Sequence, residues 1–242
     1  MKRNMILLTV IGICCETSLA INAIGPPITT LKKDQFAIGF DYSFMEVNIE
    51  VSGYGISPTL DDVEFDSYLG KIGYGITHNW QIIGYFGTTD IDWQKAPDKF
   101  NDNTDITIGF CSKATVIEAG PLPWGLALQV NWLREAEDKS LLGTYGYTGG
   151  AEAHIWELQI ATGPTVTIDE LSLYGGPFVY WIRGDVEIEN AGANWSFEVK
   201  EESIFGGFIG LQIDISDYIV ANVEYQVTND CEALGAGVAY KF

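Results

Sequence analysis

The chain has 242 residues and a formal net charge of −20. This charge argues against a nucleic-acid-binding protein, because the phosphates would be repelled. Apolar residues make up 47% of the chain, yet beyond the N-terminal run no segment has the unbroken hydrophobicity of a membrane helix. The apolar residues instead alternate with small or polar ones, which is typical of transmembrane β-strands.

The first residues predict a secretory signal peptide over residues 1–20. Lys2 and Arg3 precede an apolar run from Met5 to Cys15, and Ser18-Leu19-Ala20 supplies small residues for cleavage. The run is too short to cross a membrane, which takes roughly 20 apolar residues. The chain is therefore expected to be exported and to lose this segment.

Two further segments follow the signal peptide. Residues 21–34 are expected to form a short periplasmic lead-in, and residues 35–242 a single barrel domain. Only Cys111 and Cys231 remain after cleavage, and they lie far apart in the predicted strand order. Whether they are oxidised stays open, since nothing in their spacing supports a disulfide.

Ten stretches of the domain alternate between apolar and small or polar residues and predict β-strands. They are Phe36–Phe44, Tyr68–Ile76, Trp80–Phe86, Asp105–Lys113, Trp124–Trp132, Ala153–Ile160, Tyr174–Ile182, Phe205–Ile213, Ile219–Tyr225 and Ala233–Phe242. The apolar side of each strand, including Tyr174 to Ile182 of the seventh, is expected to face outward. Beyond Met45 the apolar positions change phase, which indicates a bulge or the point where the strand leaves the bilayer.

The connections between these strands alternate in length. Short ones are predicted near 77–79, 118–123, 163–169 and 214–217, and mostly longer, acidic ones near 53–64, 89–103, 134–146, 187–202 and 228–232. Barrels inserted from the periplasm have short turns inside and long loops outside. The fold class is therefore all-β: a single antiparallel up-and-down transmembrane β-barrel of about ten strands. Counts of eight or twelve stay open.

The closing strand carries a family resemblance. Val238, Tyr240 and Phe242 lie on its apolar face, and this ending resembles the C-terminal signal of bacterial outer-membrane β-barrels. Residues 222–230 resemble the penultimate strand and loop of the small OmpA-like and opacity-type barrels. The resemblance implies the outer membrane as the location, and membrane lipids, lipopolysaccharide and the β-barrel insertion machinery as partners.

The inward faces of the predicted strands carry six charged side chains. They are Asp41, Lys71, Lys113, Glu157, Arg183 and Glu224. Most lie at a similar depth, and they are expected to pair in a structural network because an isolated buried charge is costly. Ten strands leave little more room than the eight whose interior side chains fill, so the lumen is expected to be occluded or very narrow. The alternative is that these charges line a path for small ions.

The sequence offers no catalytic, cofactor-binding or metal-binding set. The histidines are His78 and His154, and His154-Ile155-Trp156 lacks the serine of the His-X-Ser pattern found in lipid A deacylases. A general base needs a partner within hydrogen-bond reach, and none can be named. The Cys and His residues cannot build a zinc site, and no glycine-rich phosphate loop precedes a helix. The chain is therefore expected not to be an enzyme.

Four functions follow in order of preference. The first is a structural or surface-interaction barrel, with adhesion or envelope integrity as its role and with acidic loops outside. The second is a narrow channel that prefers cations, because its mouths are acidic. An outer-membrane enzyme and a soluble secreted carrier barrel come last. The extracellular ligand of the loops, if there is one, stays open.

Overall fold

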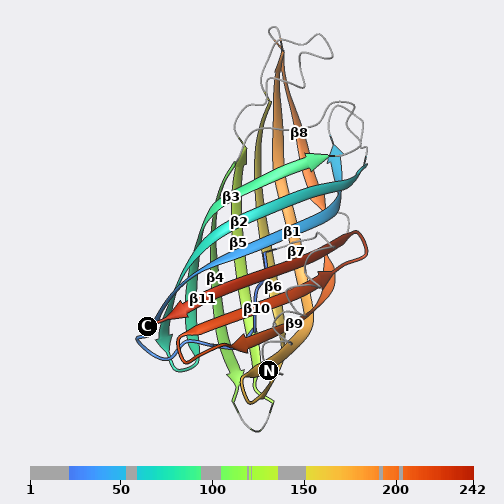
Figure 1. The fold of residues 1–242 in the computed structure, drawn as a ribbon. Coiled ribbons are helices and arrows are strands. Elements are labelled where there is room, and N and C mark those ends of the chain that lie inside the picture. Colours follow the sequence, from blue (N-terminus) through green and yellow to red (C-terminus); the bar gives the residue numbers. More distant parts are fainter. Residues whose placement is uncertain are drawn as a thin grey trace, which may run out of the picture.

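A computed structural model describes residues 22–52, 59–93, 105–118, 120, 122–135, 151–190, 193–201 and 204–242. Within them, eleven strands form one antiparallel sheet that closes on itself (Figure 1). No helix in these ranges is long and apolar enough to cross a membrane. The strands are β1 (Phe36–Ser52), β2 (Thr59–Thr77), β3 (Trp80–Trp93), β4 (Asp105–Ile117), β5 (Trp124–Glu135), β6 (Ala151–Ile168), β7 (Leu171–Asn190), β8 (Ala193–Glu201), β9 (Phe205–Asp214), β10 (Ile219–Val227) and β11 (Cys231–Lys241).

The barrel has two different circumferences. Strands β8 and β9 follow one another along the same side of β7, and β9 continues into the hairpin of β10 and β11, which pairs with β1 over Ala37 to Val47. Beyond that point β1 pairs directly with β8, over Ile49 to Ser52. The wall therefore has ten strand positions in one part and eight in the other, and the predicted count of about ten is confirmed.

Short connections lie at one end, as expected, whereas the opposite end has the long connections and also the short β7–β8 and β10–β11 connections. Turns of a few residues join β2 to β3, β6 to β7 and β9 to β10 at the end that also holds Phe242, which we call the short-connection end. Four predicted connections are wrong in detail. Strand β6 runs through Gly163 and Pro164 to Ile168 before the turn, and residues 187–202 contain the β7–β8 hairpin. Of the predicted loops at 53–64 and 89–103, Thr59 to Glu64 belong to β2 and Thr89 to Trp93 belong to β3, so both predictions are wrong there. The rest of these two loops and most of 134–146 lie outside the described residues.

The outer face of the ten-stranded part is an apolar belt. Phe36, Ile38 and Phe40 on β1 alternate outward with buried neighbours, and Ile72 on β2 is 64% exposed. Aromatic residues border the belt at both ends. Trp124 lies near the short-connection end, and Trp132, opposite Trp156, lies toward the other end. Trp124 and Trp132 are eight residues apart on β5. In a tilted barrel strand, eight residues span roughly 20 Å along the membrane normal, which suits the hydrocarbon layer of a bilayer.

The seventh predicted strand faces the opposite way from the expectation. Tyr174, Phe178, Tyr180 and Ile182 of β7 point inward and are almost completely buried. The reason is that both faces of β7 are apolar, because Leu171, Leu173, Val179 and Trp181 occupy the outer positions. Apolar alternation cannot assign the inner face of such a strand.

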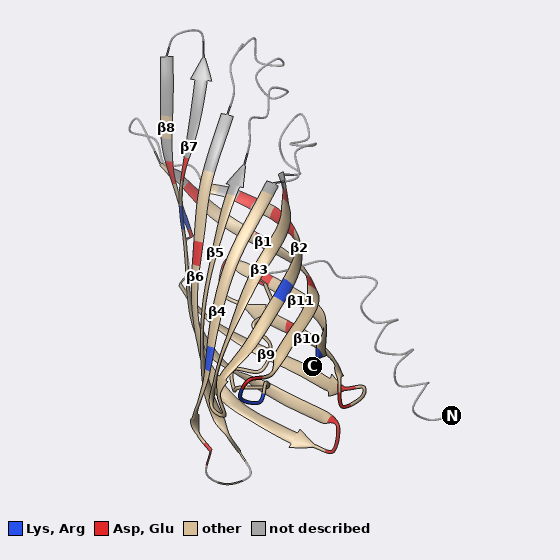
Figure 2. Cartoon of the chain, turned by 90° about the vertical axis from the view of Figure 1, so that its left-hand side faces the viewer, with Lys and Arg blue, Asp and Glu red and all other residues tan. Residues whose placement is uncertain are grey.

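The pattern reverses toward the long-connection end. Strand β1 keeps its alternation from Ala37 through Val47, so Met45 and Val47 point inward, and only between Val47 and Ile49 is the register with β2 irregular. The outward positions there carry Glu46 on β1 and Glu64 on β2. Figure 2 shows acidic residues gathered toward this end and at the turns. An apolar interior under an acidic exterior is the arrangement of a barrel in water, so this part stands above the bilayer.

This assignment of the two parts predicts opposite responses to a new charge. Ile72→Lys, in the middle of the apolar belt, is expected to lower the free energy of unfolding in lipid vesicles by about 2–4 kcal/mol. Asp90→Lys, on the exposed acidic face of β3, is expected to change it by less than about 0.5 kcal/mol. Denaturant titration of both variants in vesicles measures this, and equal destabilisation would contradict the boundary.

Candidate functional site

The interior of the ten-stranded part is occupied by the chain's own N-terminal segment. Residues Asn22 to Pro27 are buried inside the barrel, and Leu31 is buried where the segment approaches the short-connection end. We call Asn22–Leu31 the lumen plug. From the sequence, residues 21–34 are expected to form a short periplasmic lead-in. That placement is wrong for the plug, because its backbone bonds to side chains of the inner wall.

One carboxylate and one ammonium hold the centre of the plug. The Ile24 and Gly25 N–H groups donate to the two oxygens of Glu224 at 2.9 and 2.8 Å. Lys113 Nζ donates to the Ile24 carbonyl oxygen. Gln226 Nε2 also donates to Glu224, at 2.6 Å. The carboxylate thus has three N–H donors, which offsets the cost of its burial.

Wall side chains bind the rest of the plug in the same way. Gln81 Oε1 accepts the Thr30 and Leu31 N–H groups at 2.7 and 2.9 Å. At the deeper end, Ser43 Oγ donates to Asn22 Oδ1 at 2.5 Å. An extended segment inside a barrel has no neighbouring strand to pair with, so these side chains supply the partners that its backbone needs.

Small residues on the inner wall make room for the plug. A β-carbon at Gly125 would lie about 2.4 Å from the Pro27 backbone, and one at Gly235 about 2.5 Å from the Ala23 side chain. The alternation of small residues on these inner faces was visible in the sequence. It left a ten-stranded interior underfilled, which was the available signal that another part of the chain occupies it.

The six predicted lumen charges do not form one network. Lys71 Nζ lies 2.5 Å from Asp41 Oδ1, and the charges of Lys113 and Glu224 interact with this pair around the plug. Glu157 stands apart and accepts a hydrogen bond from Asn131 Nδ2 at 3.1 Å. The six charges therefore belong to different parts of the wall.

Arg183 is not a lumen residue. It alternates with the inward-facing Ile182 on β7, and its guanidinium reaches Glu201 at the end of β8. The Glu201 carboxylate also accepts the Ile182 N–H at 2.9 Å. These contacts stabilise the wall where β8 gives way to β9. Arg183 was expected to face the lumen because the inner and outer faces of β7 were exchanged in the prediction.

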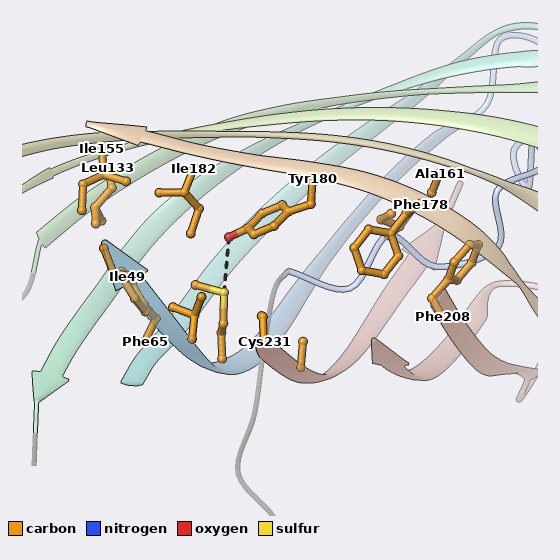
Figure 3. Packing of buried hydrophobic residues seen from close by; sticks show 14 of the residues in the cluster. Ile49, Phe65, Leu133, Ile155, Ala161, Phe178, Tyr180, Ile182, Phe208 and Cys231 are labelled. Atoms are coloured by element: carbon orange, nitrogen blue, oxygen red, sulfur yellow. Dashed lines mark hydrogen bonds between the residues drawn. The ribbon is translucent and has the colours of Figure 1, made fainter. Parts of the chain in front are cut away.

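Above the plug the interior is an apolar core. Phe65, Ile155 and Ile182 converge from different strands, and Tyr180 Oη donates to Met45 Sδ at 3.4 Å (Figure 3). A cavity of about 20 Å³ beside Asn22 and Glu157 lies below this core, with room for about one water molecule. Sequence reasoning missed this core because its apolar residues belong to strands whose lower halves point their apolar side outward.

The remaining reactive residues are separate from the plug contacts. Cys111 and Cys231 are buried free thiols in different apolar clusters, and Cys111 packs with Leu69, Ile83 and Tyr85. His78 is exposed at the β2–β3 turn, 3.7 Å from Glu118. Among the described residues, no three His, Cys, Asp or Glu side chains gather in a way that could hold a metal ion.

No protein-family model matches the chain, and no curated protein matches it. Among solved structures, the outer-membrane protein OprG from Pseudomonas aeruginosa matches with a TM-score of 0.51 and 13% identity, over 88% of this chain and 97% of that one. The fold is shared, and the apolar belt is where such a fold requires it. The protein is an outer-membrane β-barrel.

Other outer-membrane barrels match with lower scores. The attachment invasion locus protein Ail of Yersinia pestis has a TM-score of 0.36 and 16% identity, over 87% of this chain and 99% of that one. The outer membrane protease OmpT from Escherichia coli has a TM-score of 0.46 and 10% identity, over 88% and 98%.

The closing strand of the barrel has the predicted orientation. Val238, Tyr240 and Phe242 lie on the outer face, each more than two fifths exposed. Phe242 exchanges backbone hydrogen bonds with Phe36 at 2.9 and 3.1 Å, so the chain end completes the wall. That the insertion machinery reads these residues stays a prediction.

The plug contacts predict that Glu224 stabilises the folded barrel. Glu224→Gln keeps the shape of the side chain, but it removes the negative charge and replaces one accepting oxygen by an amide group. We expect the free energy of unfolding to fall by about 1–3 kcal/mol. The control is Glu232→Gln on the exposed outer face of β11, which is expected to cost less than about 0.5 kcal/mol. Heat-modified migration in gels and denaturant titration measure both, and equal stabilities would contradict the role of Glu224.

Proposed function

We propose that this outer-membrane barrel is a closed, non-enzymatic surface protein that works in adhesion or envelope integrity. The observation that carries the proposal is the filled interior. The lumen plug occupies the lower ten-stranded part, and the apolar core extends from the upper end of that part into the eight-stranded part. A barrel filled along its length acts through the surfaces that it presents.

The part above the bilayer supports this proposal. Its interior is packed like that of a water-soluble domain, so it forms a firm support for the long connections. Its outer face carries exposed acidic residues, among them Asp90, Asp185 and Glu198. Lys200 Nζ lies 3.1 Å from Glu50 Oε1, so its positive charge is paired with Glu50 and does not neutralise these acidic residues. The surface therefore suits a positively charged extracellular partner.

The apolar belt and the closing strand suggest which partners the barrel has within the envelope. The apolar belt would contact membrane lipids, including the acyl chains of lipopolysaccharide, and Val238, Tyr240 and Phe242 would contact the insertion machinery. The acidic face above the belt would repel lipopolysaccharide phosphates in the absence of divalent cations.

The filled interior weighs against the narrow cation channel that the sequence left as the alternative. The two cavities described here are about 60 and 20 Å³ and share no lining residue. Ions would have to cross the apolar core, and a dry constriction of that kind is a barrier to hydrated ions. Purified protein in planar bilayers is expected to show no discrete conductance steps. Reproducible steps that change size in Lys71→Gln would favour the channel.

Adhesion and envelope integrity are tested together in the producing bacterium. Cells without the protein are expected to lose adherence to a positively charged surface or to leak periplasmic protein. Wild-type chain should restore the lost property, whereas a folded chain with residues 94–104 and 136–150 shortened should not. Full restoration by the shortened chain, or no defect on deletion, would contradict the proposal.

The orientation that this function requires is tested separately. Asp185→Cys lies in the part above the bilayer, and Asp217→Cys lies at the β9–β10 turn. A membrane-impermeant thiol reagent added to intact cells is expected to label the first and to label the second only after the outer membrane is opened. The native Cys111 and Cys231 are buried and should stay unlabelled. Labelling of Asp217→Cys in intact cells would reverse the orientation.

A further inference from the structure

A cavity of about 60 Å³ with both apolar and charged lining residues lies between the lumen plug and the inner wall, in the half of the barrel toward the short-connection end. The plug contributes Ile24 to Pro26, Thr30 and Leu31, and the wall contributes residues of β1, β2, β3, β4, β9, β10 and β11. The volume is enough for about four water molecules, or for a small polyatomic ion that replaces them.

The lining of this cavity has a charge opposite to that of the protein. Lys71, Lys113 and Lys241 line it, whereas none of the described residues that line it is Asp or Glu. The whole chain has 33 acidic residues and only 13 Lys and Arg. Three lysines around one small space are therefore an unusual concentration of basic residues in this chain.

The nearest carboxylates are committed elsewhere. Asp41 lies behind Lys71, to which it is bonded at 2.5 Å, and the two oxygens of Glu224 accept the plug N–H groups. Asp214 is 3.4 Å from Lys241 and nearly half exposed, so solvent screens its charge. Lys113 Nζ has three protons and donates to the Ile24 carbonyl oxygen. Lys113 therefore has protons left to donate to a group in the cavity.

Neutral amides add to these donors. Gln81 accepts two plug N–H groups through its oxygen, which turns its amide nitrogen away from the plug backbone, and Gln212 and Asn222 also line the cavity. The Lys71 and Lys241 side chains keep 14% and 12% of their surface exposed. Solvent, and a dissolved ion, can therefore reach the cavity from the short-connection side.

The geometry points to a binding site for a small oxyanion of the phosphate class, entered from the periplasmic side of the barrel. Ammonium and amide groups bind such oxygens by charge-assisted hydrogen bonds, which are stronger in a partly desolvated space. The bound anion bridges β2, β4 and β11 through their lysines and so ties the closing strand to the rest of the wall. This site is independent of the surface role, because neither the long connections nor the outer face takes part in it.

The test is calorimetric titration of the full barrel with inorganic phosphate, in an uncharged, phosphate-free detergent at low ionic strength. Wild type is expected to bind one phosphate saturably. Lys241→Gln is expected to weaken binding about tenfold, the usual effect of losing one hydrogen bond to a charged group. The control is Lys33→Gln, which makes the same charge change at a side chain 67% exposed outside the cavity. It should weaken binding by less than about twofold.

A second variant separates loss of the site from loss of the fold. Gln212→Leu removes an amide donor without changing charge, and it is expected to weaken phosphate binding about threefold or more. Heat-modified migration in gels verifies that each variant is folded. The inference is overturned if wild type binds no phosphate saturably, if Lys33→Gln weakens binding as much as Lys241→Gln, or if folded Gln212→Leu binds as wild type does.

Discussion

The volume that the strands enclose has to be filled, and this requirement shapes every part of the barrel. Eight strands enclose a space that their own side chains fill, whereas ten enclose more. This barrel has ten strands around one part of its axis and eight around the other, because β1 pairs with β11 in the first part and with β8 in the second. The plug fills the extra space of the wider part, and apolar side chains of the wall fill the narrower part and the upper end of the wider one.

Each filling has its own chemistry because each part has a different surrounding. Below, lipid covers the outer face, so the apolar residues point out and the inner face is left with glycine, alanine and polar groups. Buried polar groups of the wall need hydrogen-bond partners, and so do the backbone groups of the plug. Glu224 and Gln81 therefore accept hydrogen bonds from the plug N–H groups. Above, water covers the outer face, and the same strands turn their acidic residues out and their apolar residues in. Along a single strand, the apolar residues therefore point outward where lipid surrounds the barrel and inward where water does.

This division explains which expectations failed. Outward orientation was predicted well for the strands with one apolar face, such as Trp124 to Trp132. It failed for β7, where both faces are apolar, and Arg183 was placed in the lumen as a result. The plug was missed because Asn22–Leu31 has no alternation, and its position depends on contacts with residues as far along the chain as Glu224. Local pattern carries no information about such contacts.

The amino-acid pattern alone was enough to predict the class of fold, a strand count of about ten, the end of the barrel with short turns and the outward face of the belt. Each of these follows from period-two alternation and connection length, which are local properties of the chain. What fills the barrel, which lumen charges meet and where the wall narrows from ten strands to eight are visible only in the folded chain. These depend on long-range pairing such as Ile49 with Glu201, and on the matching of an enclosed volume to the segment that occupies it.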